Sequence, residues 1–198
     1  YAIVLSRRRA AYRAKGYVKY TWEVPADRFY KEDTNSVCPQ IENHALMPYI
    51  QENRVSSPEQ KFTTFLEENT EYIDWWYKNG DSGKQHYAIS YTNVNGDKAL
   101  FYVDFVIRMK NGQVFLFDTK SEDSDKNAPC KHNALIDYIH SEENADKHLK
   151  GGVIIQSGEN WKYCPLKIEN TTDISGWDCF YPDEYKVCLL YTSDAADD

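Results

Sequence analysis

Hydrophobic and polar positions follow their clearest pattern between residues 100 and 120, in the segment LFYVDFVIRMKNGQVFLFDTK. Two runs of aromatic and β-branched residues flank Asn111-Gly112, a pair that is typical of a tight turn. The segment therefore predicts a β-hairpin. Asp104 and Asp118 lie inside the two runs, although aspartate is depleted from strands. The hairpin thus carries two carboxylates that its hydrophobic pattern does not explain.

The length of the turn decides whether the two aspartates share a face of the hairpin. A two-residue loop would place Asp118 opposite Phe105, on the other face from Asp104. A three-residue loop over residues 110–112, with Gly112 left-handed at a bulge, would place the two aspartates directly opposite each other. We favour the longer loop because it separates apolar from polar side chains better. The expected apolar face consists of Phe101, Val103, Phe105, Ile107, Met109, Gln113, Phe115, Phe117 and Thr119.

A helix is expected before the hairpin, from Ser57 to about residue 68. Ser57 is a suitable N-cap, and Pro58 suits the first helical turn. The apolar stripe consists of Phe62, Phe65 and Leu66. Glu59 lies three residues before the first of these, which places it on the same inward face. Glu67, near the helix end, is expected in solvent.

The remaining pattern predicts strands over residues 71–77, 85–94 and 151–156, and a second helix from about Cys130 to His140. With the hairpin, the elements follow the order αβββαβ in outline, with one additional early strand. We interpret residues 1–55 as a connector from a preceding, missing domain and residues 56–187 as the domain itself. The tail, residues 188–198, resembles translated sequencing adapter and is interpreted as read-through.

Composition narrows the class of protein. A hydrophobic content of 41% and an aromatic content of 15% are typical of a globular domain. We expect no membrane partner, since no apolar run reaches the roughly 18 residues of a membrane span. The five cysteines contain no CxxC pair, which favours a reducing compartment and a cytoplasmic location. A zinc site would use Cys130, His132 and Cys164, but their spacing fits no standard zinc pattern.

The paired aspartates indicate a metal site. Like charges directly opposite each other on a sheet repel, and partly buried carboxylates need a counter-charge. A hard cation such as Mg²⁺ would relieve Asp104 and Asp118, because it binds carboxylate oxygens and keeps several waters. Lys120, on the same face, would lie beside a phosphate or an attacking water. Alternatively, both acids are ordinary ion-pair partners of Arg108 and Lys120. The net charge of −8 does not by itself favour nucleic acid, although a metal site contributes acids.

The same residues match a family motif. They are Glu59 on a first helix, Val103-Asp104 on a strand and Asp118-Thr119-Lys120 on the next strand. This set resembles the PD-(D/E)XK nuclease superfamily, with Val103 in place of the proline. From about residue 20 to residue 163, the chain resembles the C-terminal nuclease-type domain of type III restriction enzyme Res-like subunits and related DEAD/DEAH-box helicase proteins. The segments PEQKFTTFLEEN, YIDWWYKNGD and KHNALIDYI, with the hairpin, carry the likeness.

The resemblance implies a restriction-endonuclease-like αβββαβ core, with a central mixed β-sheet flanked by helices. It also implies an endonuclease that hydrolyses DNA phosphodiesters with Mg²⁺, for which Mn²⁺ can substitute. Asp104 and Asp118 would hold the metal ion, and Glu59 would bind it directly or through water. Lys120 would orient the attacking water or stabilise the transition state.

Further residues and partners follow from the same resemblance. Lys131 and Asn133, on the second helix, are candidate phosphate contacts. The implied partners are DNA, a helicase or ATPase domain in the same full-length chain, and a methyltransferase or specificity subunit. The alternative is a catalytically inactive PD-(D/E)XK-fold module for DNA binding or assembly. Such a module would be expected to have lost Asp104, Asp118 or Lys120, whereas all three are present.

Overall fold

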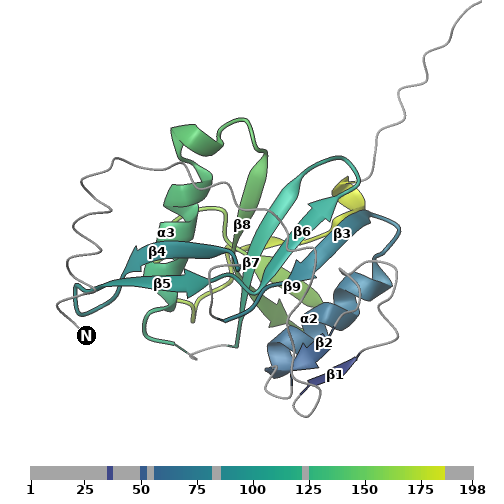
Figure 1. Cartoon of the computed structure of the whole chain (residues 1–198), viewed down its shortest axis with the longest axis horizontal. Coiled ribbons are helices and arrows are strands. Elements are labelled where there is room, and N and C mark those ends of the chain that lie inside the picture. Colours follow the sequence, from purple (N-terminus) through teal and green to yellow (C-terminus); the bar gives the residue numbers. More distant parts are fainter. Residues whose placement is uncertain (1–34, 38–49, 53–55, 82–85, 122–124, 186–198) are drawn as a thin grey trace, which may run out of the picture.

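The structure is a computed structural model that describes residues 35–37, 50–52, 56–81, 86–121 and 125–185. The described strands form a six-stranded sheet in the order β10-β9-β8-β7-β6-β3 and two separate pairs, β1-β2 and β4-β5 (Figure 1). In the large sheet β8 is parallel to β7, and the other neighbours are antiparallel. The strands are β1 (Asn35–Val37), β2 (Ile50–Glu52), β3 (Ile73–Lys78), β4 (Ala88–Thr92), β5 (Lys98–Tyr102), β6 (Phe105–Met109), β7 (Val114–Lys120), β8 (Leu149–Ser157), β9 (Asn160–Tyr163) and β10 (Asp178–Cys179).

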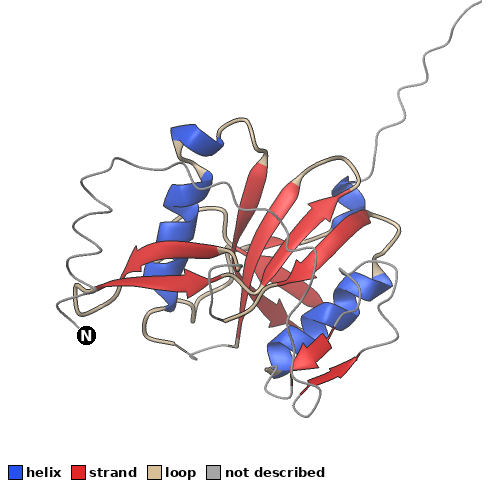
Figure 2. Cartoon of the chain, viewed as in Figure 1, coloured by secondary structure: helices blue, strands red, loops and turns tan. Residues whose placement is uncertain are grey.

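The described residues contain two α-helices, α2 (Ser57–Glu68) and α3 (Ala128–Ile139), which cover opposite faces of the large sheet (Figure 2). The helices pack on alternate side chains of β6 and β7, which point to opposite faces. On the α2 face lie Phe62, Leu66, Phe105, Ile107, Phe115 and Phe117, and on the α3 face lie Val106, Leu116, Leu135 and Ile139. The expected class, α/β with a mixed central sheet and helices, is confirmed at this level.

The hairpin of β6 and β7 has the register of the three-residue loop. Phe105 pairs with Phe117, as that loop requires. Gly112 has a φ of 89°, and its N–H donates to the carbonyl oxygen of Met109 at 2.9 Å. Glycine tolerates this left-handed backbone without the strain that a Cβ would bring. The predicted register is therefore confirmed, and it brings the residue before β6 next to the end of β7.

The first half of the predicted hairpin is not one continuous strand. β5 ends at Tyr102, the chain bends at Asp104, and β6 begins at Phe105. β5 then pairs with β4, outside the large sheet. Because of this bend, Phe101 and Val103 pack in the cluster on the α3 face. The single apolar face predicted for both runs is wrong for these two residues.

Asn79, which directly follows β3, holds the bend in place. Its Nδ2 donates to the carbonyl oxygens of Tyr87 at 2.8 Å and Val103 at 2.9 Å, while its Oδ1 accepts from the N–H of Tyr87 at 3.0 Å. Its own N–H donates to the carbonyl oxygen of Asp104 at 2.8 Å. One buried side chain therefore joins the end of β3, the segment leading into β4 and the bend. These bonds fix the backbone that carries Asp104.

Replacing Asn79 by alanine is expected to lower the free energy of unfolding by about 2–3 kcal/mol. The change leaves the backbone groups of Tyr87 and Val103 without their partner in a buried place. Urea denaturation measures the loss. Asn95→Ala, at an exposed turn position, serves as the control and should change stability by less than about 0.5 kcal/mol. Equal effects of the two substitutions would contradict the role of Asn79.

The first helix is capped one residue earlier than predicted. The N-cap is Ser56, not Ser57, because the Ser56 hydroxyl accepts from the N–H of Glu59 at 3.4 Å. The Glu59 carboxylate in turn accepts from the Ser56 N–H at 2.7 Å, which completes a capping box. Glu67 is not in solvent as expected, since its carboxylate accepts a 2.8 Å hydrogen bond from the indole of Trp76. Glu59 points inward, as predicted.

Other boundaries also differ from the pattern. The second helix begins at Ala128 rather than Cys130, and β4 is shorter than the strand expected over residues 85–94. Four strands, β1, β2, β9 and β10, were not predicted; the first two lie in the segment interpreted as a connector. Residues 1–34 and the tail, residues 188–198, lie outside the described residues. Among the described residues, no helix combines the length and apolar character needed to cross a membrane.

Candidate functional site

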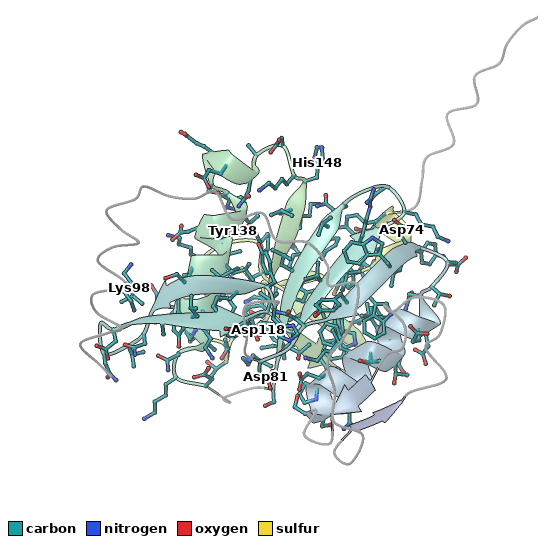
Figure 3. The ribbon with its side chains drawn as sticks, viewed as in Figure 1. Asp74, Asp81, Lys98, Asp118, Tyr138 and His148 are labelled. Carbon is teal, nitrogen blue, oxygen red and sulfur yellow. The ribbon has the colours of Figure 1, made fainter. Side chains whose placement is uncertain are left out.

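Five ionisable side chains meet where β3 and β7 end and β6 begins. Glu59 comes from α2, Lys78 is the last residue of β3, and Asp104 precedes β6. Asp118 and Lys120 lie at the end of β7, and Asp118 is near the centre of the molecule (Figure 3). The structure thus brings together the predicted residues Glu59, Asp104, Asp118 and Lys120, and it adds a second lysine.

Asp104 is held by the neighbouring strand. Its Oδ2 accepts two 2.7 Å hydrogen bonds from Thr119, one from the backbone N–H and one from the hydroxyl. Its Oδ1 lies 3.7 Å from Nζ of Lys78. The register of β6 and β7, together with the bend at Asp104 that Asn79 holds, produces the contact with Thr119, because both place Asp104 beside the end of β7. One oxygen of the carboxylate is therefore fixed, and the other faces the site.

Asp118 is a buried carboxylate with one oxygen that lacks a hydrogen-bond partner among the described residues. Its Oδ1 lies 3.1 Å from Nζ of Lys120, and the residue is only 4% exposed. Its Oδ2 is buried and, in the described part of the chain, has no hydrogen-bond partner. A buried acceptor without a partner costs about 1–3 kcal/mol, and more when it is charged. This oxygen therefore marks a place where a group from outside the chain would fit.

The charges of the site act strongly on one another. Burial, together with the charge of Asp118, raises the pKa of Asp104 to about 7, although the ammonium groups of Lys78 and Lys120 oppose this. Burial would lower the pKa of Lys120, but the carboxylates of Asp118 and Asp104 outweigh it and raise that pKa. Lys120 therefore stays protonated. Full ionisation of Asp104 at neutral pH therefore calls for additional positive charge.

The metal-free protein is expected to lose stability by a few kcal/mol as the pH rises from about 4 to about 7. The pKa of Asp104 is about 7 in the folded chain against a model value of 3.8, so the folded state binds this proton more tightly in that window. Stability from this group is complete below the unfolded value and is lost as the pH rises through the folded value. Thermal unfolding in EDTA measures the effect. Asp104→Asn should remove this slope, and an unchanged slope would contradict the assignment.

Lys78 is the residue of this cluster that was not predicted from the sequence. Its Nζ lies 2.7 Å from Oε1 of Glu59 and also donates to the carbonyl oxygen of Asn79 at 3.3 Å. Burial would raise the pKa of Glu59, but the charge and hydrogen bond of Lys78 outweigh it and lower that pKa. The segment KNGDSGK had the composition of a loop, so its first lysine was not assigned to a strand. The predicted site itself held a signal for a second lysine. It contained three inward carboxylates and only Lys120 to pair with them, whereas buried charges are normally paired.

Lys131 and Asn133 have partners outside this cluster. Nζ of Lys131 lies 2.6 Å from Oδ2 of Asp125. The negative charge of Asp125 is in turn one of the causes that raise the pKa of Lys120. Lys131 therefore stands at the margin of the site. Asn133 exchanges two hydrogen bonds with the backbone of Ile168, at 2.9 and 2.8 Å. Its amide anchors the segment after β9, and a phosphate contact by either residue stays a prediction.

The zinc alternative does not fit the surroundings of His132. Its Nδ1 accepts from the N–H of Val153 at 3.0 Å, and its Nε2 donates to the carbonyl oxygen of Leu166 at 2.7 Å. Burial lowers the pKa of this imidazole, so it is neutral. Both ring nitrogens are thus used in joining α3, β8 and the segment after β9. A zinc ligand needs one of them free.

The ion-pair alternative fits only in part. Lys120 pairs with Asp118, but Arg108 pairs with Asp74 at 3.3 Å on the exposed surface and not with either aspartate of the site. Within the residues that the structure describes, no group of three or more His, Cys, Asp or Glu side chains is placed to hold a metal ion. Neither family models, nor curated proteins, nor solved structures give a match to this chain.

Proposed function

We propose that this domain is a metal-dependent DNA endonuclease of the PD-(D/E)XK type. The observation that carries the proposal is the buried, unpartnered Oδ2 of Asp118, close to Asp104 and Lys120. Buried carboxylates that lack enough counter-charge are suited to a hard divalent cation, and a lysine beside them is suited to a phosphate. The donor set fits Mg²⁺, with Mn²⁺ as a substitute.

The order of elements supports the same proposal. In the large sheet the chain passes through β3, β6 and β7 as antiparallel neighbours and then through α3 to β8, which is parallel to β7. With α2 in front, this sequence of elements agrees with the αβββαβ core that the resemblance implies. The β4-β5 pair is an insertion between β3 and β6. Val103 and Asp104 directly precede β6, and Asp118, Thr119 and Lys120 end β7.

Asp104 and Asp118 would hold the cation in this mechanism. When bound there, it lowers the pKa of a water and neutralises charge on the phosphoryl oxygens. Thr119 keeps the Asp104 carboxylate in one orientation through its two hydrogen bonds. Lys120, protonated and 3.1 Å from Asp118, presents its ammonium to the water or to the charge that develops on phosphate.

The finer parts of the proposal rest on the resemblance. They are the assignment to a type III restriction Res-like helicase-nuclease, the helicase or ATPase domain in the same full-length chain, and a methyltransferase or specificity subunit as partner. The second candidate function is a non-cutting module that binds DNA or assembles with other domains. A folded protein that binds DNA and leaves it intact in Mg²⁺ and in Mn²⁺ would favour that candidate.

Replacing Lys120 by alanine is expected to slow metal-dependent DNA cleavage by about a hundredfold or more, the range for loss of one group that stabilises a transition state. The assay follows nicking of supercoiled plasmid by the whole 198-residue chain in Mg²⁺, Mn²⁺ or EDTA. Lys167→Ala is the matched control, because Lys167 forms an exposed ion pair with Asp137. It should cut at the wild-type rate. Metal-dependent cutting that survives Lys120→Ala would overturn the assigned role.

A further inference from the structure

The two oxygens of Glu59 are both engaged by the chain. Oε1 lies 2.7 Å from Nζ of Lys78, and Oε2 accepts from the N–H of Ser56 at 2.7 Å. The second bond belongs to the capping box that begins α2. Asp118 differs, since its Oδ2 has no partner in the described residues. The protein itself thus holds Glu59 in place, whereas Oδ2 of Asp118 could accept a contact from a ligand.

Lys78 occupies the space between Glu59 and Asp104. Its ammonium lies 2.7 Å from the first carboxylate, 3.7 Å from the second and 5.2 Å from the ring centroid of Phe105. The residue is 5% exposed, so this charge is held in the interior. A lysine buried in this way needs paired carboxylates around it, and these surroundings also fix its position.

We propose that Lys78 is a positioning residue whose ammonium permanently fills the cation place between Glu59 and Asp104, so that the site takes one divalent metal ion and not two. Glu59 then acts through Lys78 and is not a metal ligand. The single ion binds at Asp104 and Asp118. This inference rests on the proposed function and departs from one expectation of the resemblance, namely that Glu59 would bind the metal directly or through water.

The charge balance of the cluster supports one ion. Three carboxylates and two ammonium groups, when all are ionised, leave one negative charge. One divalent cation turns this into one positive charge, which suits a phosphate diester. A second cation would have to approach the ammonium of Lys78 in a buried place where Glu59 is already neutralised. Like charges in such surroundings repel strongly.

The test counts Mn²⁺ ions bound to the whole chain, by the loss of the free Mn²⁺ signal in electron paramagnetic resonance and by calorimetry. The wild type should bind one Mn²⁺. Glu59→Gln should also bind one, with a Kd within about threefold, while Asp118→Asn should lose binding by at least about a hundredfold. Lys78→Met should bind two, because Glu59 and Asp104 become a second carboxylate pair. Lys78→Arg, which keeps the charge, should return the count to one.

The outcomes separate this inference from the proposed function. Two ions bound to the wild type, or loss of the single ion in a folded Glu59→Gln protein, would overturn the role of Lys78 and leave the nuclease proposal standing. No Mn²⁺ bound to the folded wild type would overturn the nuclease proposal itself, and the inference with it. A folded Lys78→Met protein that binds only one ion would also overturn the role of Lys78. If that variant does not fold, two ions in the wild type or a lost ion in Glu59→Gln still overturns it.

Discussion

Asp118→Asn is expected to slow Mg²⁺-dependent DNA cleavage by about a thousandfold and at the same time to stabilise the metal-free protein. The carboxylate carries the unpartnered Oδ2 that would bind the cation, and asparagine cannot supply that charge. A bound metal contributes several kcal/mol of charge stabilisation, and each ~1.4 kcal/mol is tenfold in rate. Stability should rise because the charge of Asp118 is one cause of the raised pKa of Asp104. Lys120 keeps a partner in this variant, since the asparagine oxygen can still accept its hydrogen bond and the carboxylate of Asp104 remains as its counter-charge.

Two measurements check this pair of effects. Single-turnover nicking of plasmid gives the rate, and thermal unfolding in EDTA at neutral pH gives the stability. Asp74→Asn is the matched control, since Asp74 is half exposed, lies on β3 and pairs with Arg108 on the surface. It should change neither quantity appreciably. A fully active Asp118→Asn protein, or one that is less stable than the wild type, would count against this account of the site.

Lys78→Met is expected to lower the free energy of unfolding by roughly 3–5 kcal/mol, the cost of removing one member of a buried ion pair. Methionine can fill the space of the lysine stem, so the loss would come from the charge. Without the ammonium, Glu59 keeps its bond to Ser56 but loses its counter-charge, and Asp104 loses a counter-charge at 3.7 Å. Urea denaturation in EDTA at neutral pH measures the difference.

A double substitution distinguishes charge from packing. Glu59→Gln combined with Lys78→Met removes both members of the pair, so much of the lost stability should return. Added Mn²⁺ should also stabilise the single Lys78→Met variant more than it stabilises the wild type, because the metal replaces the missing charge. If the double variant is as unstable as Lys78→Met, the effect comes from packing, and the electrostatic role of Lys78 is wrong.

Local rules were enough to predict the hairpin and the register of its two strands. The choice between two registers depended on Gly112 and on the faces that each register would form, and both are properties of one short segment. The inward position of Glu59 followed in the same way from its spacing to Phe62. Of the four residues in the predicted site, Asp104, Asp118 and Lys120 were therefore predicted from one hairpin. The fourth, Glu59, was predicted from one helix.

The parts that sequence reading missed depend on distant contacts. The bend at Asp104 is made by Asn79, which lies 24 residues before Val103 and hydrogen-bonds to its backbone. Nothing in the alternation of residues 100–109 marks such a break. Lys78 could not be placed because its partners come from α2 and from the bend. The role of a lysine at the end of an aromatic strand can be inferred only when its contacts with those elements are known.

We propose that Asp104 and Asp118 hold a metal ion that the protein needs to cut DNA. The most direct test is the conversion of supercoiled plasmid to nicked or linear product by the wild type and by the Asp104→Asn/Asp118→Asn double variant, each in Mg²⁺ and in EDTA. We expect product from the wild type in Mg²⁺ but not in EDTA, and no product from the double variant in either. Cleavage by the double variant at the wild-type rate, or no cleavage by the folded wild type in Mg²⁺ or Mn²⁺, would contradict the proposal.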